Sequence, residues 1–337
     1  MTIRARSPLR ISFGGGGTDV SPYCDERGGA VLSCTVNRFA YATLVPGGER
    51  IEVRSLDYDT SVSFALDEEF VYEGQLKLAL AVVDRFRRDY GLTDGLEVFL
   101  HNDAPPGSGL GSSSAITVAL IGALAKHLRV PFDGYQLSEL AYEIERVDVG
   151  IKGGRQDQYA TAFGGVNFIE FERGGVVVNP LRLRPETLYE LEYSLVFAYV
   201  GGQHFSSHII ERQVDNFTSG RTDAVTAMDE LKDIAYEMKR ALLLGKLDEF
   251  GELLHAGWLA KKRMAEGITT GRIDEVYEAA RAAGALGGKV SGAGGGGFMF
   301  FLADPTRRFA VQEALRQTGA ELVSFSVVQE GMRSWSV

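Results

Sequence analysis

The 337-residue sequence has only two cysteines and no long apolar segment. Cys24 and Cys34 are too few for a disulfide framework or a thiolate metal cluster, so we expect both to be ordinary packing residues. No apolar run reaches the roughly 18 residues of a membrane span, and MTIRARSPLR at the start lacks the apolar core of an export signal. We therefore expect a cytoplasmic protein without a membrane partner.

Positive charge is also scarce, because 35 Lys and Arg residues face 45 Asp and Glu residues and give a formal net charge of -10. An excess of negative charge disfavours nucleic acid and anionic membranes as partners. Any anionic ligand must therefore be held by local donors. The length and an ordinary 45% content of hydrophobic residues fit a chain of two globular domains.

Several familiar motifs are missing. No G-x-x-x-x-G-K-[ST], G-x-S-x-G or H-E-x-x-H pattern occurs, so P-loop, hydrolase and zinc-peptidase readings lack their usual markers. Gly292, Gly294 and Gly297 do match G-x-G-x-x-G. The following FMFFLA predicts a strand, however, where a dinucleotide-binding fingerprint needs a helix. This context counts against a dinucleotide oxidoreductase.

The pattern of strands and helices predicts two α+β halves of mixed order, with residues 1–184 forming one domain and residues 185–337 the other. In the first half we expect strands up to about Phe64, helices over 76–90, 115–128, 135–147 and 155–163, a strand over 96–100, and a hairpin over 166–181. In the second half we expect a strand at SLVFAYV, helices over 208–283, a strand, glycine turn and strand over 289–303, a helix over 306–317 and a strand over 321–328.

Three glycine-rich segments each adjoin a predicted strand. They are SPLRISFGGGGTDV (7–20), PPGSGLGSSSA (105–115) and KVSGAGGGGFMF (289–300). One glycine cluster alone is usually a turn. The second segment lies between a strand and a long apolar helix, where free backbone N–H groups and the helix dipole favour a phosphate group.

Polar residues beside these segments suggest phosphoryl transfer. One serine among 112–114 suffices to cap the helix, and a further hydroxyl can complete the coordination of Mg²⁺. The carboxylate that Mg²⁺ also needs can come from Glu139, Glu143, Glu145 or Asp148. Asp157 follows a glycine break. It is either the acidic residue that lies near an acceptor hydroxyl or an acid at a helix N-terminus that the helix dipole stabilises. Arg10 lies in an apolar strand, either as a functional cation or as a charge that protects a sheet edge.

Taken together and in this order, the three segments resemble the motifs of the GHMP kinases. The resemblance covers essentially the whole chain and implies an α+β, two-domain GHMP kinase fold. Its N-terminal domain would be of the type found as the second domain of a small-subunit ribosomal protein, and its C-terminal domain would be ferredoxin-like. It further implies ATP and Mg²⁺ as cofactors and phosphoryl transfer to a small-molecule hydroxyl.

The resemblance also assigns roles to individual residues. Glu145 precedes Asp157 by twelve residues, as the magnesium glutamate precedes the catalytic aspartate in the sugar kinases of the family, and Arg10 precedes Asp19 by nine, as in galactokinase. The implied catalytic residues are Asp157 and Arg10, and the implied metal ligands are Ser113 and Glu145. The implied ATP-binding residues are Gly107, Ser108, Gly109, Leu110, Gly111, Ser112, Ser113 and Ser114. The implied substrate-binding residues are Gly16, Gly17, Thr18, Asp19, Arg155, Gly294 and Gly295.

Within the family, GGGGTD, VDVGIKGGRQDQYA and GGKVSGAGGGGFM are most similar to the bacterial heptose 7-phosphate kinases, with fucokinase-like domains next. The glycines at 14–17 replace a bulkier galactokinase signature, and we expect them to widen the sugar pocket. A sugar phosphate substrate would need a second anion site, for which Arg6, Arg38, Lys152, Arg155 and Lys289 are the candidates. Fucose, an N-acetylhexosamine or a non-sugar alcohol are alternative acceptors, a non-catalytic sensor is an alternative function, and a homodimer is expected on frequency alone.

Overall fold

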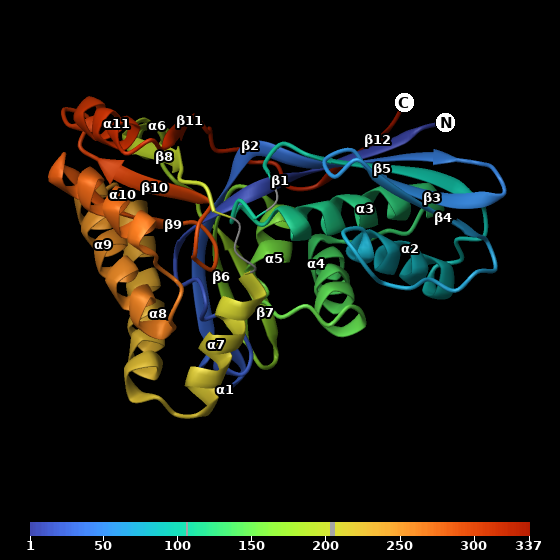
Figure 1. Cartoon of the computed structure of the whole chain (residues 1–337), viewed down its shortest axis with the longest axis horizontal. Coiled ribbons are helices and arrows are strands. Elements are labelled where there is room, and N and C mark those ends of the chain that lie inside the picture. The colour runs from blue at the N-terminus through green and yellow to red at the C-terminus, as the bar shows by residue number, and fades with distance from the viewer. Residues whose placement is uncertain (106, 203–205) are drawn as a thin grey trace.

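The computed structural model describes residues 1–105, 107–202 and 206–337, so Pro106 of the second glycine-rich segment lies outside the described residues. Within these ranges the chain forms two sheets, each covered by helices (Figure 1). No helix in these ranges is long and apolar enough to cross a membrane.

The first sheet belongs to the N-terminal half and runs in the order β12-β1-β2-β5-β3-β4, with β6 and β7 branching from β2. The long strand β2 makes this branch possible, because its first part pairs with β6 and its last part with β5. All pairs are antiparallel except β3 with β5. The strands are β1 (Ile3–Gly14), β2 (Gly29–Pro46), β3 (Arg50–Ser55), β4 (Thr60–Ala65), β5 (Leu96–Asn102), β6 (Val166–Glu172), β7 (Gly175–Pro180) and β12 (Arg333–Ser336).

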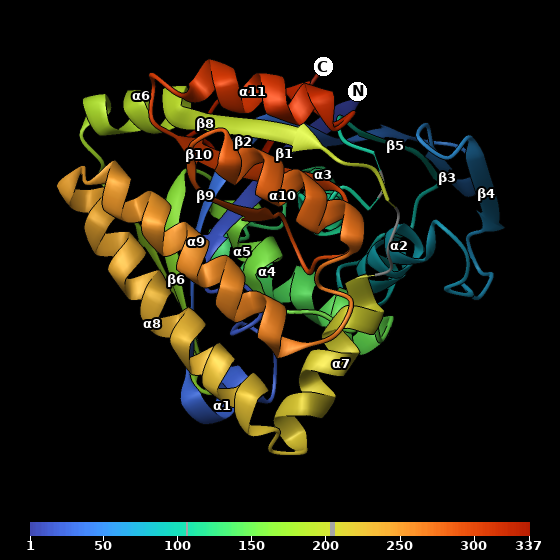
Figure 2. The same ribbon diagram turned by 60° about the vertical axis from the view of Figure 1, so that its left-hand side comes forward.

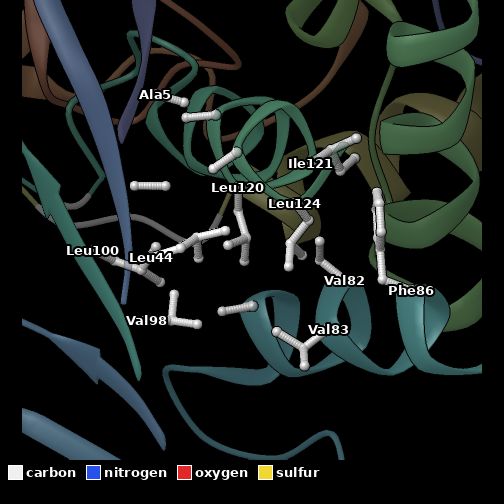
Figure 3. Close-up of a cluster of buried hydrophobic side chains, with 14 of the residues drawn as sticks. Ala5, Leu44, Val82, Val83, Phe86, Val98, Leu100, Leu120, Ile121 and Leu124 are labelled. Atoms are coloured by element: carbon white, nitrogen blue, oxygen red, sulfur yellow. The ribbon is translucent and has the colours of Figure 1, made fainter. Parts of the chain in front are cut away.

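One face of this sheet packs on helices, and α3 (Ser112–Leu128) lies at the centre of the core. Its side chains are buried nearly all round, as the apolar sequence predicts, because the sheet covers one side and other helices the rest. Figure 3 shows Leu120 and Leu124 of α3 pointing into one cluster with Leu44 of β2 and Val83 of α2 (Lys77–Asp89). The other helical elements of this half are α1 (Tyr23–Arg27), α2 (Lys77–Asp89), α4 (Gly134–Glu143), the π-helical turn η1 (Ile144–Asp148) and α5 (Gln156–Phe163).

The second half is built on a sheet of order β11-β8-β10-β9, with every neighbouring pair antiparallel. In chain order this is fourth, first, third, second, the arrangement of a ferredoxin-like sheet, and it confirms the predicted α+β fold class. Helices α8 and α9 lie side by side (Figure 2). The strands are β8 (Leu195–Tyr199), β9 (Ala285–Val290), β10 (Phe298–Ala303) and β11 (Glu321–Val323). The helices are α6 (Pro185–Ser194), α7 (Ser206–Thr218), α8 (Thr222–Leu244), α9 (Leu247–Met264), α10 (Gly271–Ala282) and α11 (Arg308–Gln317).

The end of the chain departs from the predicted pattern. The strand expected over 321–328 stops at Val323, and the chain then runs back to the first sheet, where β12 pairs with β1. One hydrophobic cluster also joins the halves, because Phe13 of β1 packs edge-on against Phe250 of α9 and Phe300 of β10. The boundary at 184 and 185 stays a prediction, but the residues of β12 belong to the sheet of the first half.

Candidate active site

A cavity of about 560 Å³ opens where the three glycine-rich segments meet. Gly17 lines it from the first segment, Gly109 from the second and Gly292 from the third. On one side the wall comes from β3, α2 and β5, and on the other from α5, α7 and α9. Both halves of the chain therefore contribute to one site.

The second segment forms a loop that leads directly into the N-terminus of α3. Gly107, Gly109 and Gly111 have φ angles of 75°, 77° and 73°, a left-handed conformation that favours glycine. These glycines line the cavity together with Ser112 and Ser113, as a phosphate-binding loop should. Of the other predicted ATP-binding residues, Ser108, Leu110 and Ser114 are buried and do not line the cavity.

The third glycine-rich segment packs against this loop and holds it by hydrogen bonds. Ser291 Oγ donates to the carbonyl oxygen of Gly109 at 2.9 Å, and the N–H of Phe298 donates to that of Ser108 at 3.0 Å. A Cβ atom on Gly297 would lie only 2.5 Å from Ser108 O, so the two backbones are in close contact. Gly297 thus brings the third segment against the glycine loop of residues 107–111.

Two predicted substrate-binding glycines are absent from the cavity wall. Gly295 donates its N–H to Ile268 O at 2.9 Å, and a Cβ on Gly294 would lie 2.5 Å from the same oxygen. Both glycines therefore pack on the loop that precedes α10. Their neighbours Gly292 and Ala293 line the cavity instead.

Arg10, which is buried, and Asp157, which is partly buried, form an ion pair at the glycine loop of residues 107–111. Arg10 Nε and Nη2 lie 2.7 and 2.6 Å from Asp157 Oδ1, and Arg10 Nη1 donates to Gly109 O at 2.6 Å. Arg10 is 4% exposed, which contradicts the reading of this residue as a solvated charge at a sheet edge. A Cβ on Gly111 would lie 3.3 Å from Asp157 Oδ2, so the carboxylate faces the loop. The pair thus brings a cation and a carboxylate to the place where phosphates would bind.

Asp19 is buried beside this pair, and its carboxylate is held by three hydrogen bonds. Its carboxylate accepts from the N–H of Gly17 at 2.9 Å, from the N–H of Gln156 at 3.1 Å and from Gln156 Nε2 at 3.2 Å. A Cβ on Gly154 would overlap Asp19 Oδ2 at 1.9 Å, which explains the glycine break before α5. Asp19, Gly17 and Gln156 all line the cavity.

The remaining predicted substrate residues lie off the cavity wall. Thr18 is fully buried, and its hydroxyl donates to Gly15 O at 2.8 Å. Gly16 does not line the cavity, although its carbonyl oxygen accepts a hydrogen bond from Lys261. Arg155 also lies off the cavity wall, with its guanidinium 4.6 Å from the centre of the Tyr142 ring.

The glycines at 14–17 are required by packing more than by pocket width. A Cβ on Gly14 would lie 2.7 Å from Met238 Sδ of α8, and one on Gly15 would lie 1.7 Å from Ala30 O. Only Gly17 of the four lines the cavity. A wider sugar pocket, which we expected from all four glycines, therefore stays a prediction for Gly17 alone.

Glu145 lies in the π-helical turn η1, a type of turn that is frequent at functional sites. It is 1% exposed, and burial is the main reason that its pKa is raised above the usual value. Its Oε2 accepts from Ser114 Oγ at 3.0 Å and lies 3.3 Å from Arg146 Nη1, while Oε1 has no partner among the described residues. The predicted partner Ser113 lines the cavity, whereas Glu145 does not, and no hydrogen bond joins these two residues.

Two buried lysines lie beneath the site, and the sequence reading missed the first. Lys261 Nζ donates to Gly16 O at 3.0 Å and lines the cavity, and burial lowers its pKa to about 8. Lys289 Nζ donates to Ser12 O at 2.7 Å, and burial lowers its pKa well below the usual value. The sequence does indicate that Lys261 is buried, because it lies on the apolar face of α9 together with Leu254 and Trp258.

Of the five basic residues considered for a second phosphate, only Lys152 lines the cavity. Arg6 stacks on Phe39, and Arg38 lies over Phe325. Arg146, which the sequence reading did not single out, also lines the cavity. Its guanidinium donates to the carbonyl oxygen of Gly154, so it shapes the loop before α5 as well.

Comparison with known proteins agrees with this arrangement. Residues 77–165 match the GHMP kinases N terminal domain, and residues 238–321 match the GHMP kinases C terminal domain. The chain is 37% identical to D-glycero-alpha-D-manno-heptose 7-phosphate kinase of Campylobacter jejuni, over all of this chain and 99% of that protein. A crystal structure of a D-glycero-D-manno-heptose 1-phosphate kinase from Bacteroides thetaiotaomicron superposes with a TM-score of 0.83 at 36% identity, covering 99% of both chains.

A more distant structure shares the fold. Lactococcus lactis galactokinase superposes with a TM-score of 0.80 at 20% identity, covering 98% of this chain and 95% of that one. The full-length match at 37% identity and the two family domains in their proper order together establish that this chain is an ATP-dependent kinase of the GHMP family.

Proposed function

We propose that the protein phosphorylates the anomeric hydroxyl of D-glycero-D-manno-heptose 7-phosphate with ATP to give the 1,7-bisphosphate, ahead of nucleotide-heptose synthesis for surface polysaccharide. The single observation that carries a sugar kinase function is the Arg10–Asp157 ion pair between the phosphate loop and the buried carboxylate of Asp19. The choice of heptose is supported by the full-length similarity to a kinase named for that substrate.

We place the two substrates on opposite sides of the cavity. The side formed by β3, the turn after it, α2 and β5 offers Ser55, Tyr58 and Asn102 to the base and ribose, and the phosphates would lie on the glycine loop. The side with Asp19 and Gln156 would then hold the sugar. Lys152 and Arg146 are the cavity-lining cations available to the 7-phosphate.

In the proposed reaction the anomeric oxygen forms a bond to the γ-phosphorus, the bond from that phosphorus to the bridging oxygen breaks, and ADP leaves. The hydroxyl proton passes to Asp157. Both short contacts from Arg10 go to Asp157 Oδ1, which leaves Oδ2 to accept from the hydroxyl. Arg10 would also offset negative charge on the γ-phosphoryl group, so positioning and electrostatic stabilisation supply most of the rate.

Mg²⁺ fits the residues around Glu145. The unpaired Oε1 atom is a buried acceptor, and a hard cation prefers carboxylate and hydroxyl oxygens. We propose that Glu145 and Ser113 hold the ion, with Ser114 orienting the carboxylate. When bound, Mg²⁺ neutralises charge on the β- and γ-phosphates.

The direct test is ADP release by the purified protein with Mg²⁺ and ATP, measured against a panel of sugars and sugar phosphates. We expect turnover with heptose 7-phosphate at a kcat/KM at least tenfold above that for fucose and N-acetylhexosamines. Preferred turnover of a neutral sugar would discard the substrate but keep the mechanism. ATP binding without turnover of any acceptor would favour a sensor, although the intact Arg10–Asp157 pair counts against that function.

Glu145→Gln tests the metal site. We expect the Mg²⁺ concentration for half-maximal velocity to rise by about tenfold or more, because the variant lacks the charge that attracts the cation. The matched control is Glu143→Gln, two residues earlier, where the side chain is 46% exposed and pairs with Arg85. An unchanged Mg²⁺ requirement in Glu145→Gln, with its thermal stability retained, would refute the assignment.

A further inference from the structure

Unpaired polar atoms gather around the backbone of Gly16 and Gly17. Among the described residues, Gln156 Oε1, Gln213 Nε2 and Ser12 Oγ are buried without a hydrogen-bond partner. A Cβ on Gly16 would lie 3.2 Å from Ser12 Oγ and 3.6 Å from Gln156 Nε2, and one on Gly17 would lie 3.3 Å from Gln213 Oε1. Because a buried polar group without a partner destabilises the fold, this concentration of unpaired atoms points to a ligand that supplies the missing partners.

Two of the side chains concerned come from the second half of the chain. Gln213 of α7 and Lys261 of α9 are each 2% exposed, yet both line the cavity. A Cβ on Gly16 would lie 3.9 Å from Lys261 Nζ, so the ammonium group belongs to the same cluster. The ammonium group of Lys261 has three N–H donors, and it uses one of them in the hydrogen bond to Gly16 O, so two remain for a ligand.

Basic side chains outnumber carboxylates around Gly16. Arg10, Lys261 and Lys289 lie near the two carboxylates of Asp19 and Asp157. Asp157 is committed to Arg10, and Asp19 lies near the two lysines without forming a direct ion pair with either. The cluster therefore offers donors in excess, and electron-rich oxygen atoms are the matching ligands.

We propose that Gln213 and Lys261, together with Gln156 and Asp19, form the subsite that binds the ring hydroxyls of the sugar acceptor. A sugar hydroxyl both donates and accepts, so it can donate to Gln156 Oε1 or Asp19 and accept from Gln213 Nε2 or Lys261 Nζ. The inference rests on the proposed sugar kinase function and adds that α7 and α9 select the acceptor. Neither side chain takes part in the transfer step itself.

Gln213→Met removes the amide at nearly constant size. We expect it to raise the KM for the sugar by about 5- to 10-fold, while the KM for ATP changes less than twofold, since one neutral hydrogen bond is lost. Lys261→Met should raise the sugar KM by about 10- to 100-fold, because the lost donor is charged. The sugar used is heptose 7-phosphate, or the best substrate of the panel. Gln317→Met, at an exposed position near the end of α11, is the matched control.

Deoxy sugars separate binding from a structural role. For the analogue that lacks the hydroxyl bound by Gln213, the wild type should already show the higher KM, and Gln213→Met should raise it no further. An equal penalty for every analogue, or parallel changes in the KM for ATP, would overturn the inference. Gln213→Glu, which exchanges a donor for an acceptor, gives a second variant if Gln213→Met folds poorly.

The wild-type result keeps the two proposals apart. Wild-type turnover of a sugar with an unchanged sugar KM in both Gln213→Met and Lys261→Met overturns the subsite and leaves the kinase function in place. Failure of the wild type to phosphorylate any sugar overturns both.

Discussion

Replacing Asp157 with asparagine is expected to lower kcat by at least about 100-fold, while the KM for ATP stays within a few-fold of the wild type. Asparagine keeps the size and one oxygen that can accept from Arg10, but it cannot take the hydroxyl proton. It also leaves the charge of Arg10, which is 4% exposed, without its counter-ion. Steady-state ADP release and single-turnover phosphorylation measure the effect.

The control is Asp133→Asn. Asp133 is an exposed N-cap residue of α4 that accepts from the N–H of Gln136, and asparagine caps a helix about as well as aspartate. This variant should keep the wild-type kcat. If Asp157→Asn also turns over at nearly the wild-type rate, Asp157 does not accept the proton and serves only to position Arg10.

Gly109→Ala is expected to raise the KM for ATP by about tenfold or more and to lower the melting temperature by several degrees. Gly109 has a φ of 77°, where a residue with a Cβ is strained by roughly 1–2 kcal/mol. The added Cβ would also lie 2.3 Å from Ser291 O, so the third glycine-rich segment must move away from the loop that it supports. Thermal melting and ATP titration report the two effects separately.

Gly91→Ala provides a matched comparison, because Gly91 has a φ of 75° but nothing within 4 Å of the added Cβ. This variant shares the backbone strain and lacks the collision. It should lose a little stability and keep the KM for ATP. Equal effects in the two variants would mean that the contact between Gly109 and Ser291 does not support nucleotide binding.

The local features of the fold could be predicted from the sequence. The phosphate loop and α3 are both encoded in one continuous stretch, where three glycines precede an apolar helix. Local pattern also predicted the strand, glycine turn and strand of the third segment, and the structure shows that these two strands pair antiparallel. Such features depend on residues close in the chain, and periodicity and turn chemistry report on them directly.

Features that depend on distant contacts were harder to predict. Apart from the family resemblance, the sequence did not distinguish Glu145 from three other acidic residues, because its burial in the π-helical turn depends on a contact with Ser114 of α3. Glu139 instead accepts from Tyr159, and Asp148 pairs with Arg85. Gln213 lies in a helix with no special pattern, and only the fold brings it to Gly17. The family resemblance implied roles for Arg10 and Asp157. Their ion pair could not be predicted, because it depends on how β1 and α5 pack together.

The pairing of β12 with β1 has a consequence for the order in which the protein can form during synthesis. Ile3 pairs with Ser336, so one side of β1 has no partner at that position until nearly all the residues described here have left the ribosome. An unpaired sheet edge can pair with other chains. Arrested nascent chains that end before Arg333 should therefore bind chaperones or aggregate more readily than chains that include β12. Strand β12 thus covers an edge of β1 in a sheet whose other strands are translated earlier.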